Sequence, residues 1–273
     1  MTAFAVRRVL ALFFMGTLAA ACSKDSTSGK SSGARRSAAA KSDDSAAGTV
    51  DLSADGYRVG PMSSMGAVSG TIGLNGPPPS PTVPVTTDQK LCGTSAEGPI
   101  VANAKGISNA VVWISDVKTG KPLPTEKRIS LSSEKCILDP RVDAVIVGTT
   151  VNVFNDDKLL HRLVFTRAGT NDTLTVMPFF NVGQVVPSER LAKEPGIVEV
   201  RCAMHPWTHA YLLVFDQPYY AVTEDDGSFK IDSLPPGNYK MMVWHEGMAK
   251  PAEQQVQVSA GGTAKVDLKI QAH

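Results

Sequence analysis

A thiol and two imidazoles are the side chains of this sequence best suited to chemistry. Cys202 ends a run in which apolar and charged residues alternate, so it shares the inward face of a predicted strand with the valines of that run. His205 follows in a loop that Pro206 keeps from becoming helical, and His161 lies on the apolar face of another predicted strand. One thiolate and two imidazoles among apolar side chains are the protein ligands of a type 1 copper site. We therefore expect Cys202, His205 and His161 to bind one copper ion that cycles between Cu(I) and Cu(II).

The first 21 residues have the organisation of an export signal. Arg7 and Arg8 precede an apolar run from 9 to 15, and small residues then lead to Cys22. The approach to Cys22 resembles the bacterial lipobox, which implies that this cysteine is lipidated and begins the mature protein. The resemblance implies a lipid-anchored, periplasm-facing protein of the bacterial envelope, and Ser23 after the cysteine favours the outer membrane. The alternative is a free periplasmic protein in which Cys22 has no special role.

Three cysteines remain if Cys22 is acylated. In an oxidising compartment an odd number leaves one thiol outside any internal pair. Cys92 and Cys136 have similar neighbours and no nearby histidine in the sequence, so we expect them to form a disulfide. Cys202, which has a histidine three residues on, is then the free thiol.

Composition limits the classes of function. The 273 residues carry a net charge of +1 and 19% charged residues, which provides no basic field for nucleic acid. Residues 22–65 contain too few large apolar side chains to offset the entropy of ordering them, so they are predicted to be a flexible tether. No Ser/His/Asp order, phosphate loop or spaced carboxylate pair stands out, and we do not expect an enzyme. We expect a monomer whose partners are the membrane, through its anchor, and an unidentified redox protein.

From residue 66 onward the sequence predicts short strands separated by turns. The predicted strands lie at 67–74, 109–114, 144–147, 151–154, 161–165, 197–202, 210–215, 228–231, 239–244 and 264–268. The one predicted helical segment is a turn near 187–193. Many short strands with Gly- and Pro-containing turns predict an all-β sandwich or barrel.

Two turns resemble those of the carboxypeptidase regulatory-like, transthyretin-type β-sandwich, one of the carbohydrate-binding-like folds. They are Asp-Asp-Gly-Ser-Phe at 225–229 and Leu-Pro-Pro-Gly-Asn-Tyr at 234–239, and the strands at 68–74 and 110–114 look like the opening strands of that family. The two parts, 66–123 and 217–273, are separated by residues 124–216, where these motifs do not occur. This arrangement predicts a second domain inserted into an exposed loop of the first.

The inserted stretch resembles a cupredoxin, which implies a Greek-key β-barrel or sandwich. Between 195 and 207 it combines Pro-Gly, Cys202 and the triplet His205-Pro206-Trp207, a spacing similar to the short-loop amicyanin type. With 218–223 and the Val-Trp-His-Glu run at 243–246, it resembles bacterial envelope proteins of the methylamine-utilisation-like or plastocyanin-like kind over about 66–246. The resemblance implies that His161, Cys202 and His205 are the copper ligands.

Two positions differ from that family pattern. Thr208 stands where the short-loop type has an axial Met, and Arg162 follows His161 where many members have Asn. The axial position is therefore open to His209, a backbone oxygen, a water or no ligand. An imidazole there would lower the reduction potential, and an empty axis would raise it.

These features predict a copper-binding one-electron carrier of the envelope. Three alternatives remain: a metal-free module that binds carbohydrate or protein, a protein that stores or delivers Cu(I), and a zinc site, which three ligands with an open position also fit. His245 is interpreted as a hydrogen-bonded structural residue at the domain junction, and Trp207 as a packing residue. Asp156 and Asp157 are interpreted as turn residues.

Overall fold

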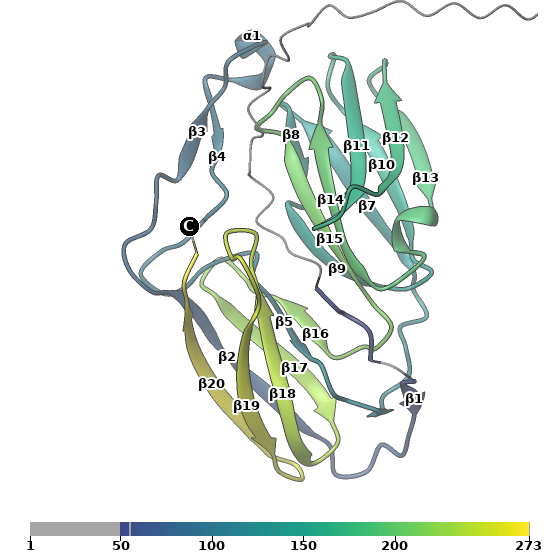
Figure 1. Cartoon of the computed structure of the whole chain (residues 1–273), viewed down its shortest axis with the longest axis vertical. Helices are drawn as coiled ribbons and strands as arrows, with labels where there is room; N and C mark the ends of the chain where they lie inside the picture. The colour runs from purple at the N-terminus through teal and green to yellow at the C-terminus, as the bar shows by residue number, and fades with distance from the viewer. Residues whose placement is uncertain (1–49, 55, 273) are drawn as a thin grey trace, which may run out of the picture. The chain divides into compact units, whose positions relative to one another are not determined.

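The computed structural model describes residues 50–54 and 56–272, and almost all of its regular elements are strands. This part of the chain contains twenty strands, one four-residue helix and one short 3-10 helix, so the predicted all-β fold is confirmed (Figure 1). The predicted export signal, Cys22 and the tether up to residue 49 lie outside the described residues. Among the described helices, none has the length and apolar character needed to cross a bilayer.

Two facing sheets form what we call the outer sandwich. One has the order β16-β5-β18-β19 and the other β17-β2-β20, and they enclose one apolar core that includes Ile72, Ile114 and Met241. The turn before β17 depends on Gly227, whose φ of 75° is left-handed and whose Cβ, if present, would lie 2.4 Å from a backbone oxygen. The strands are β2 (Gly66–Leu74), β5 (Val111–Ile114), β16 (Tyr220–Val222), β17 (Ser228–Leu234), β18 (Gly237–Trp244), β19 (Ala252–Val258) and β20 (Thr263–Ile270).

A second pair of sheets, which we call the inserted lobe, occupies the chain between β5 and β16. Its sheets have the orders β13-β10-β7-β8 and β12-β11-β14-β15-β9. The apolar side chains between them include Val153, Phe165 and Val200, and Cys202 belongs to the same core. The strands are β7 (Arg128–Glu134), β8 (Ile137–Asp139), β9 (Val142–Ile146), β10 (Thr150–Asn155), β11 (His161–Arg167), β12 (Thr173–Phe179), β13 (Gln184–Ser188), β14 (Gly196–Cys202) and β15 (His209–Phe215). The helical turn expected near 187–193 is a 3-10 helix, η1 (Arg190–Ala192).

A small excursion between β2 and β5, which we call the flap, reaches the inserted lobe. It consists of β3 (Thr82–Pro84), the helix α1 (Gln89–Cys92) and β4 (Ser95–Glu97), and β3 pairs with β4. A disulfide joins Cys92 at the end of α1 to Cys136, beside β8. The flap therefore lies against the inserted lobe, although its sequence belongs to the outer sandwich.

The prediction of a tether extending to residue 65 is wrong for its last part. Leu52 and Ala54 are buried, and the backbone N–H of Ala54 donates to the Asp216 carboxylate at 2.7 Å. Strand β1 (Arg58–Val59) then pairs with β6 (Thr119–Gly120). Leu52 packs into the core at the junction of the outer sandwich and the inserted lobe, and this burial offsets the entropy of ordering the stretch.

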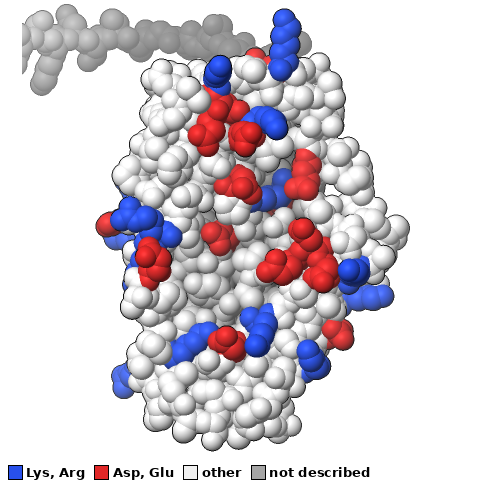
Figure 2. Space-filling model, turned by 180° about the vertical axis from the view of Figure 1, so that it is seen from behind, with Lys and Arg blue, Asp and Glu red and all other residues white. Residues whose placement is uncertain are grey.

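The outer sandwich and the inserted lobe share an apolar junction and a buried ion pair. Arg141 precedes β9, Glu246 follows β18, and their side chains meet at 2.5 Å with 8% and 3% exposure. On the face shown in Figure 2, acidic and basic side chains are interspersed, in keeping with the net charge of +1. The apolar junction includes Val111, Trp113 and Trp244 from the outer sandwich and Val142, Leu213 and Phe215 from the inserted lobe.

Candidate metal centre

Neighbouring strands bring the three predicted ligands together. His161 is the first residue of β11 and Cys202 is the last residue of β14, and these strands are antiparallel neighbours with Leu163 opposite Cys202. His205 lies in the loop between β14 and β15, which is closed by backbone bonds from Cys202 N to Thr208 O at 3.0 Å and from Thr208 N to His205 O at 2.9 Å. The loop therefore returns His205 to the strand end that carries Cys202.

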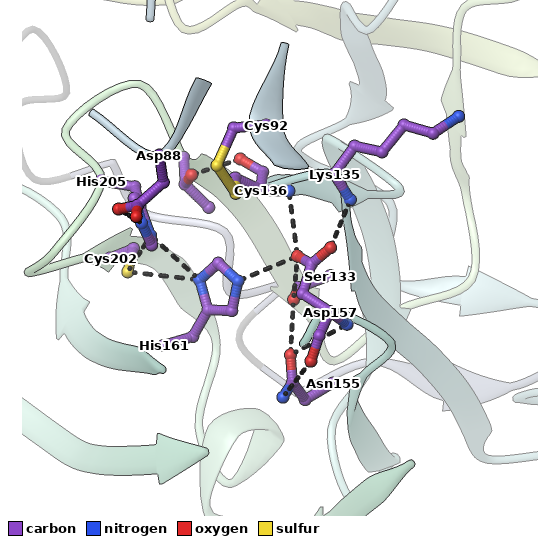
Figure 3. Close-up of a disulfide and its surroundings, with 11 residues drawn as sticks. Asp88, Cys92, Ser133, Lys135, Cys136, Asn155, Asp157, His161, Cys202 and His205 are labelled. Carbon is purple, nitrogen blue, oxygen red and sulfur yellow. Dashed lines mark hydrogen bonds and ion pairs between the residues drawn. A yellow bond between two sulfur atoms is a disulfide. The ribbon is translucent and has the colours of Figure 1, made fainter. Parts of the chain in front are cut away.

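The three donor atoms form a tight triangle, which we call the metal centre. Cys202 Sγ lies 3.6 Å from His161 Nδ1 and 3.6 Å from His205 Nδ1, and the two Nδ1 atoms are 3.3 Å apart. All three residues are buried: Cys202 is 4% exposed, His161 0% and His205 2%. In Figure 3 both rings turn their Nδ1 edges toward the cysteine sulfur.

These separations fit a bound metal ion. Bonds of about 2.0–2.3 Å to nitrogen and sulfur at near-tetrahedral angles place neighbouring ligand atoms roughly 3.3–3.6 Å apart. The donor set of one thiolate and two imidazoles suits copper, and three protein ligands with a fourth position open also suit zinc. The geometry therefore supports a metal site at His161, Cys202 and His205.

Asp157 fixes the orientation of the first imidazole. His161 Nε2 lies 2.9 Å from Asp157 Oδ2, so this nitrogen donates to the carboxylate and Nδ1 is the nitrogen that faces Cys202 and is available to a metal. The carboxylate is itself held by the backbone N–H groups of Lys135, at 2.6 Å, and Cys136, at 2.9 Å. The Ser133 hydroxyl lies 3.2 Å from the same carboxylate. The sequence interpretation treated Asp157 only as a turn residue, and its place four residues before His161 was the available signal.

Asp88 of the flap orients the His205 imidazole in the same way that Asp157 orients His161. His205 Nε2 lies 3.2 Å from Asp88 Oδ2, and the Asp88 side chain is 47% exposed. The Trp207 ring also packs against the His205 ring, with the ring centroids 5.4 Å apart. This contact agrees with the packing role predicted for Trp207. Nothing in the sequence pattern pointed to Asp88, because 117 residues separate it from His205.

Hydrogen bonding within the centre shifts the proton affinities of two ligands. Burial raises the pKa of the Cys202 thiol. Hydrogen bonds from the His161 ring and from nearby backbone N–H groups lower it by more, so the pKa falls from its usual 9.0 to about 6. Burial lowers the pKa of His161, while Asp157 and Cys202 raise it to about 9. Both shifts favour a thiolate beside a protonated imidazole in the metal-free protein, and the thiolate is the form of the sulfur that binds metals.

His209, expected as a possible axial ligand, lies elsewhere. It pairs with Arg201 across β14 and β15, and cross-strand partners point to the same face of a sheet, opposite to that of Cys202. Its Nε2 lies 3.0 Å from Glu246 Oε2 and its Nδ1 lies 3.1 Å from the Trp207 carbonyl. His209 therefore belongs to the buried ion-pair cluster and not to the metal centre.

The other positions near the centre are also accounted for. The Thr208 hydroxyl donates to the Cys136 carbonyl, and the Met204 side chain is 48% exposed. Among the described residues, the donor groups that include Cys202 comprise only His161 and His205. His245 is fully buried at the junction, where its Nδ1 accepts a hydrogen bond from Gly247 N at 3.1 Å.

The fold and the site together define an all-β protein in which one sandwich carries a second lobe that contains the buried cluster of one thiol and two imidazoles. Residues 203–271 match the family model of the carboxypeptidase regulatory-like domain. This match covers the outer sandwich from β16 to β20, and it also includes β15, which pairs within the inserted lobe.

Curated relatives resemble only part of the chain. The probable rhamnogalacturonate lyase A of Aspergillus flavus is 30% identical over 112 residues, which are 40% of this chain and 21% of the lyase. The enzyme of the same name from Neosartorya fischeri is 32% identical over 107 residues, which are 38% of this chain and 20% of the lyase. The chain thus spans about a fifth of the length of these relatives.

Solved structures with partial similarity include cupredoxins and a copper enzyme. A reduced amicyanin variant matches with a TM-score of 0.27 and 19% identity, over 34% of this chain and 96% of amicyanin. A purple cupredoxin from Nitrosopumilus maritimus matches with a TM-score of 0.27 and 21% identity, over 32% of this chain and 97% of that protein. A copper-containing nitrite reductase from Thermus scotoductus has a TM-score of 0.29 and 22% identity, over 37% and 24% of the two chains.

Proposed function

We propose that this protein binds one copper ion through His161, Cys202 and His205 and carries single electrons in the bacterial envelope. The observation that carries the proposal is the buried triangle of one sulfur and two Nδ1 atoms with sides of 3.3–3.6 Å. A bound copper ion would supply one-electron chemistry between Cu(I) and Cu(II).

The chain's own residues supply a rigid and dry environment. His161 and Cys202 are fixed by strand pairing, and each imidazole is oriented by a carboxylate on its far nitrogen. Ligands held in this way before the metal arrives need little rearrangement when the charge of the site changes. Burial of all three ligands keeps bulk water away from them.

The cellular setting is part of the proposal and is supported by sequence features alone. The signal-like residues 1–21 and the lipobox-like approach to Cys22 support a lipid-anchored protein that faces the periplasm. Such a protein would exchange electrons as a monomer with a separate redox protein. The outer sandwich would serve as the scaffold of the inserted lobe or as a docking surface.

Absorption and EPR spectra after addition of Cu(II) to the metal-free protein test the proposal. We expect an intense thiolate-to-copper band near ~600 nm and a copper content of one ion per chain. The Cys202→Ser variant should lose the band and keep its fold. The matched control is His209→Ala, which removes a histidine of the same strand pair outside the metal centre and should keep the band.

Other outcomes would support the other functions. Binding of zinc with no absorption band for Cu(II) would support a zinc site, and binding of Cu(I) alone would support copper storage or delivery. Absence of any metal binding would contradict the proposal. The match to the carboxypeptidase regulatory-like domain would then favour a binding module.

A further inference from the structure

The disulfide that anchors the flap lies directly beside the metal centre. The sulfurs of Cys92 and Cys136 and one ring nitrogen of His205 all lie within 4.8 Å of one another. Cys92 is 4% exposed and Cys136 is 0% exposed, so this group is as deeply buried as the metal centre itself. Figure 3 shows the disulfide next to His205 and Asp88.

The same two sulfurs become strong metal ligands once the bond between them is broken. A thiolate is a metal ligand and a nucleophile, and soft thiolates favour Cu(I). The two Cα atoms are 5.2 Å apart, so two separate thiolates would still face one another from neighbouring backbone segments. With His205 they would form a set of two sulfurs and one nitrogen, a combination suited to a soft monovalent ion.

Contacts other than the disulfide hold both cysteines in place. The Cys136 backbone N–H donates to Asp157 at 2.9 Å, and its carbonyl accepts the Thr208 hydroxyl. The Cys92 backbone N–H bonds to the Asp88 carbonyl at 3.0 Å. Both side chains also pack in an apolar cluster with Val85, Ala96 and Trp207. The donors should therefore stay close together after reduction.

We propose that Cys92, Cys136 and His205 form a second copper site, specific for Cu(I), that exists only when the Cys92–Cys136 disulfide is reduced. A dithiol reductant transfers two electrons and two protons to the disulfide, whose S–S bond breaks to give two thiols, and the reductant becomes a disulfide. Binding of Cu(I) then releases the two thiol protons as the thiolates coordinate the ion, and the Nε2 proton of His205, which faces Asp88 in the oxidised protein, leaves to solvent so that this nitrogen can coordinate as well.

The inference rests on the proposed copper function, because His205 belongs to both donor sets. It adds a property that a simple electron carrier does not need: the copper capacity of the protein depends on its thiol redox state. The oxidised protein holds one ion at His205 Nδ1, and the reduced protein would hold a second ion at His205 Nε2, in place of the contact of that nitrogen with Asp88.

Anaerobic titration with Cu(I), in competition with bathocuproine disulfonate, tests the inference. The full-length chain is used in a Cys22→Ser background, so that residue 22 does not contribute a thiol. The oxidised protein should bind one Cu(I). The protein reduced with a phosphine, then freed of reductant, should bind two Cu(I), and X-ray absorption should show the sulfur donors per copper rising above one.

Two variants separate this inference from the proposed function. Cys92→Ser combined with Cys136→Ser should bind one Cu(I) with or without reductant, whereas Cys202→Ser should gain one tightly held Cu(I) only on reduction. If the double variant does not fold, the sulfur count in the reduced wild type decides. One ion in both redox states would overturn the second site and leave the first intact, and no ion in the oxidised wild type would overturn the proposed function itself.

Discussion

The most informative single substitution is Asp157→Asn, because one carboxylate orients His161 and also holds the loop that carries Cys136. Asp157 Oδ1 accepts the Lys135 N–H, and Oδ2 accepts the Cys136 N–H and the His161 ring. An asparagine has one oxygen and one NH2 group. In its better orientation it keeps the Oδ2 bonds and presents a donor to the Lys135 N–H, which then has no acceptor.

The magnitude follows from these contacts. The Lys135 N–H lies in a partly buried contact, and a donor left unsatisfied by burial costs about 1–3 kcal/mol, while the lost charge weakens the remaining hydrogen bonds. We expect the free energy of unfolding of the metal-free protein to fall by about 2–4 kcal/mol in total. Because a carboxylate behind a metal-binding histidine contributes a factor of ~10–100 to affinity, copper binding should weaken by that factor.

Urea unfolding of the metal-free protein and chelator competition for copper measure the two effects. The matched control is the neighbouring Asp156→Asn, which makes the same chemical change at an exposed side chain. This control should stay within about 0.5 kcal/mol of wild type and keep its copper affinity. Equal behaviour of the two variants in both assays would refute the role given to Asp157.

Further predictions concern the junction between the outer sandwich and the inserted lobe. Glu246→Gln leaves the buried Arg141 without its counter-charge and should lower the free energy of unfolding by roughly 3–5 kcal/mol in urea titrations. Asp232→Asn, which breaks an exposed ion pair, should lower it by less than ~1 kcal/mol, and a similar loss in both variants would contradict this account. Burial lowers the pKa of His245 from its usual 6.5 to about 4. The unfolded chain therefore binds a proton more readily than the folded protein does. The contribution of His245 to the free energy of unfolding is fully present above pH ~6.5 and is lost as the pH falls toward 4. Between pH 7.5 and 5 this residue should remove about 2 kcal/mol, and the loss should be smaller in His245→Asn; equal pH dependence of the two proteins would exclude His245 as the cause.

Local patterns in the sequence were sufficient for ten of the twenty described strands and for the inward-facing ligands, but they did not predict β7, β12, β13 or β19. In a strand the side chains alternate between the two faces, so the run ending at Cys202 shows which residues face the core. The same rule applies to β15, where Ala210 and Leu212 belong to the core of the inserted lobe and Tyr211 to the junction. Applied to His209, it places that ring on the junction face, so the sequence contained the signal against an axial role.

The oriented metal centre was decided only by the tertiary structure. Asp88 reaches His205 because the flap folds back against the inserted lobe, and the sequence distance of 117 residues leaves no periodic trace of that contact. The burial of Leu52 depends in the same way on an apolar core formed by distant strands. Strand identity and facing direction are properties of neighbouring residues along the chain, whereas hydrogen bonds between loops depend on which strands become neighbours in space. The sequence by itself thus determined the sulfur and nitrogen donors, and the packing of flap against lobe determined how they are held.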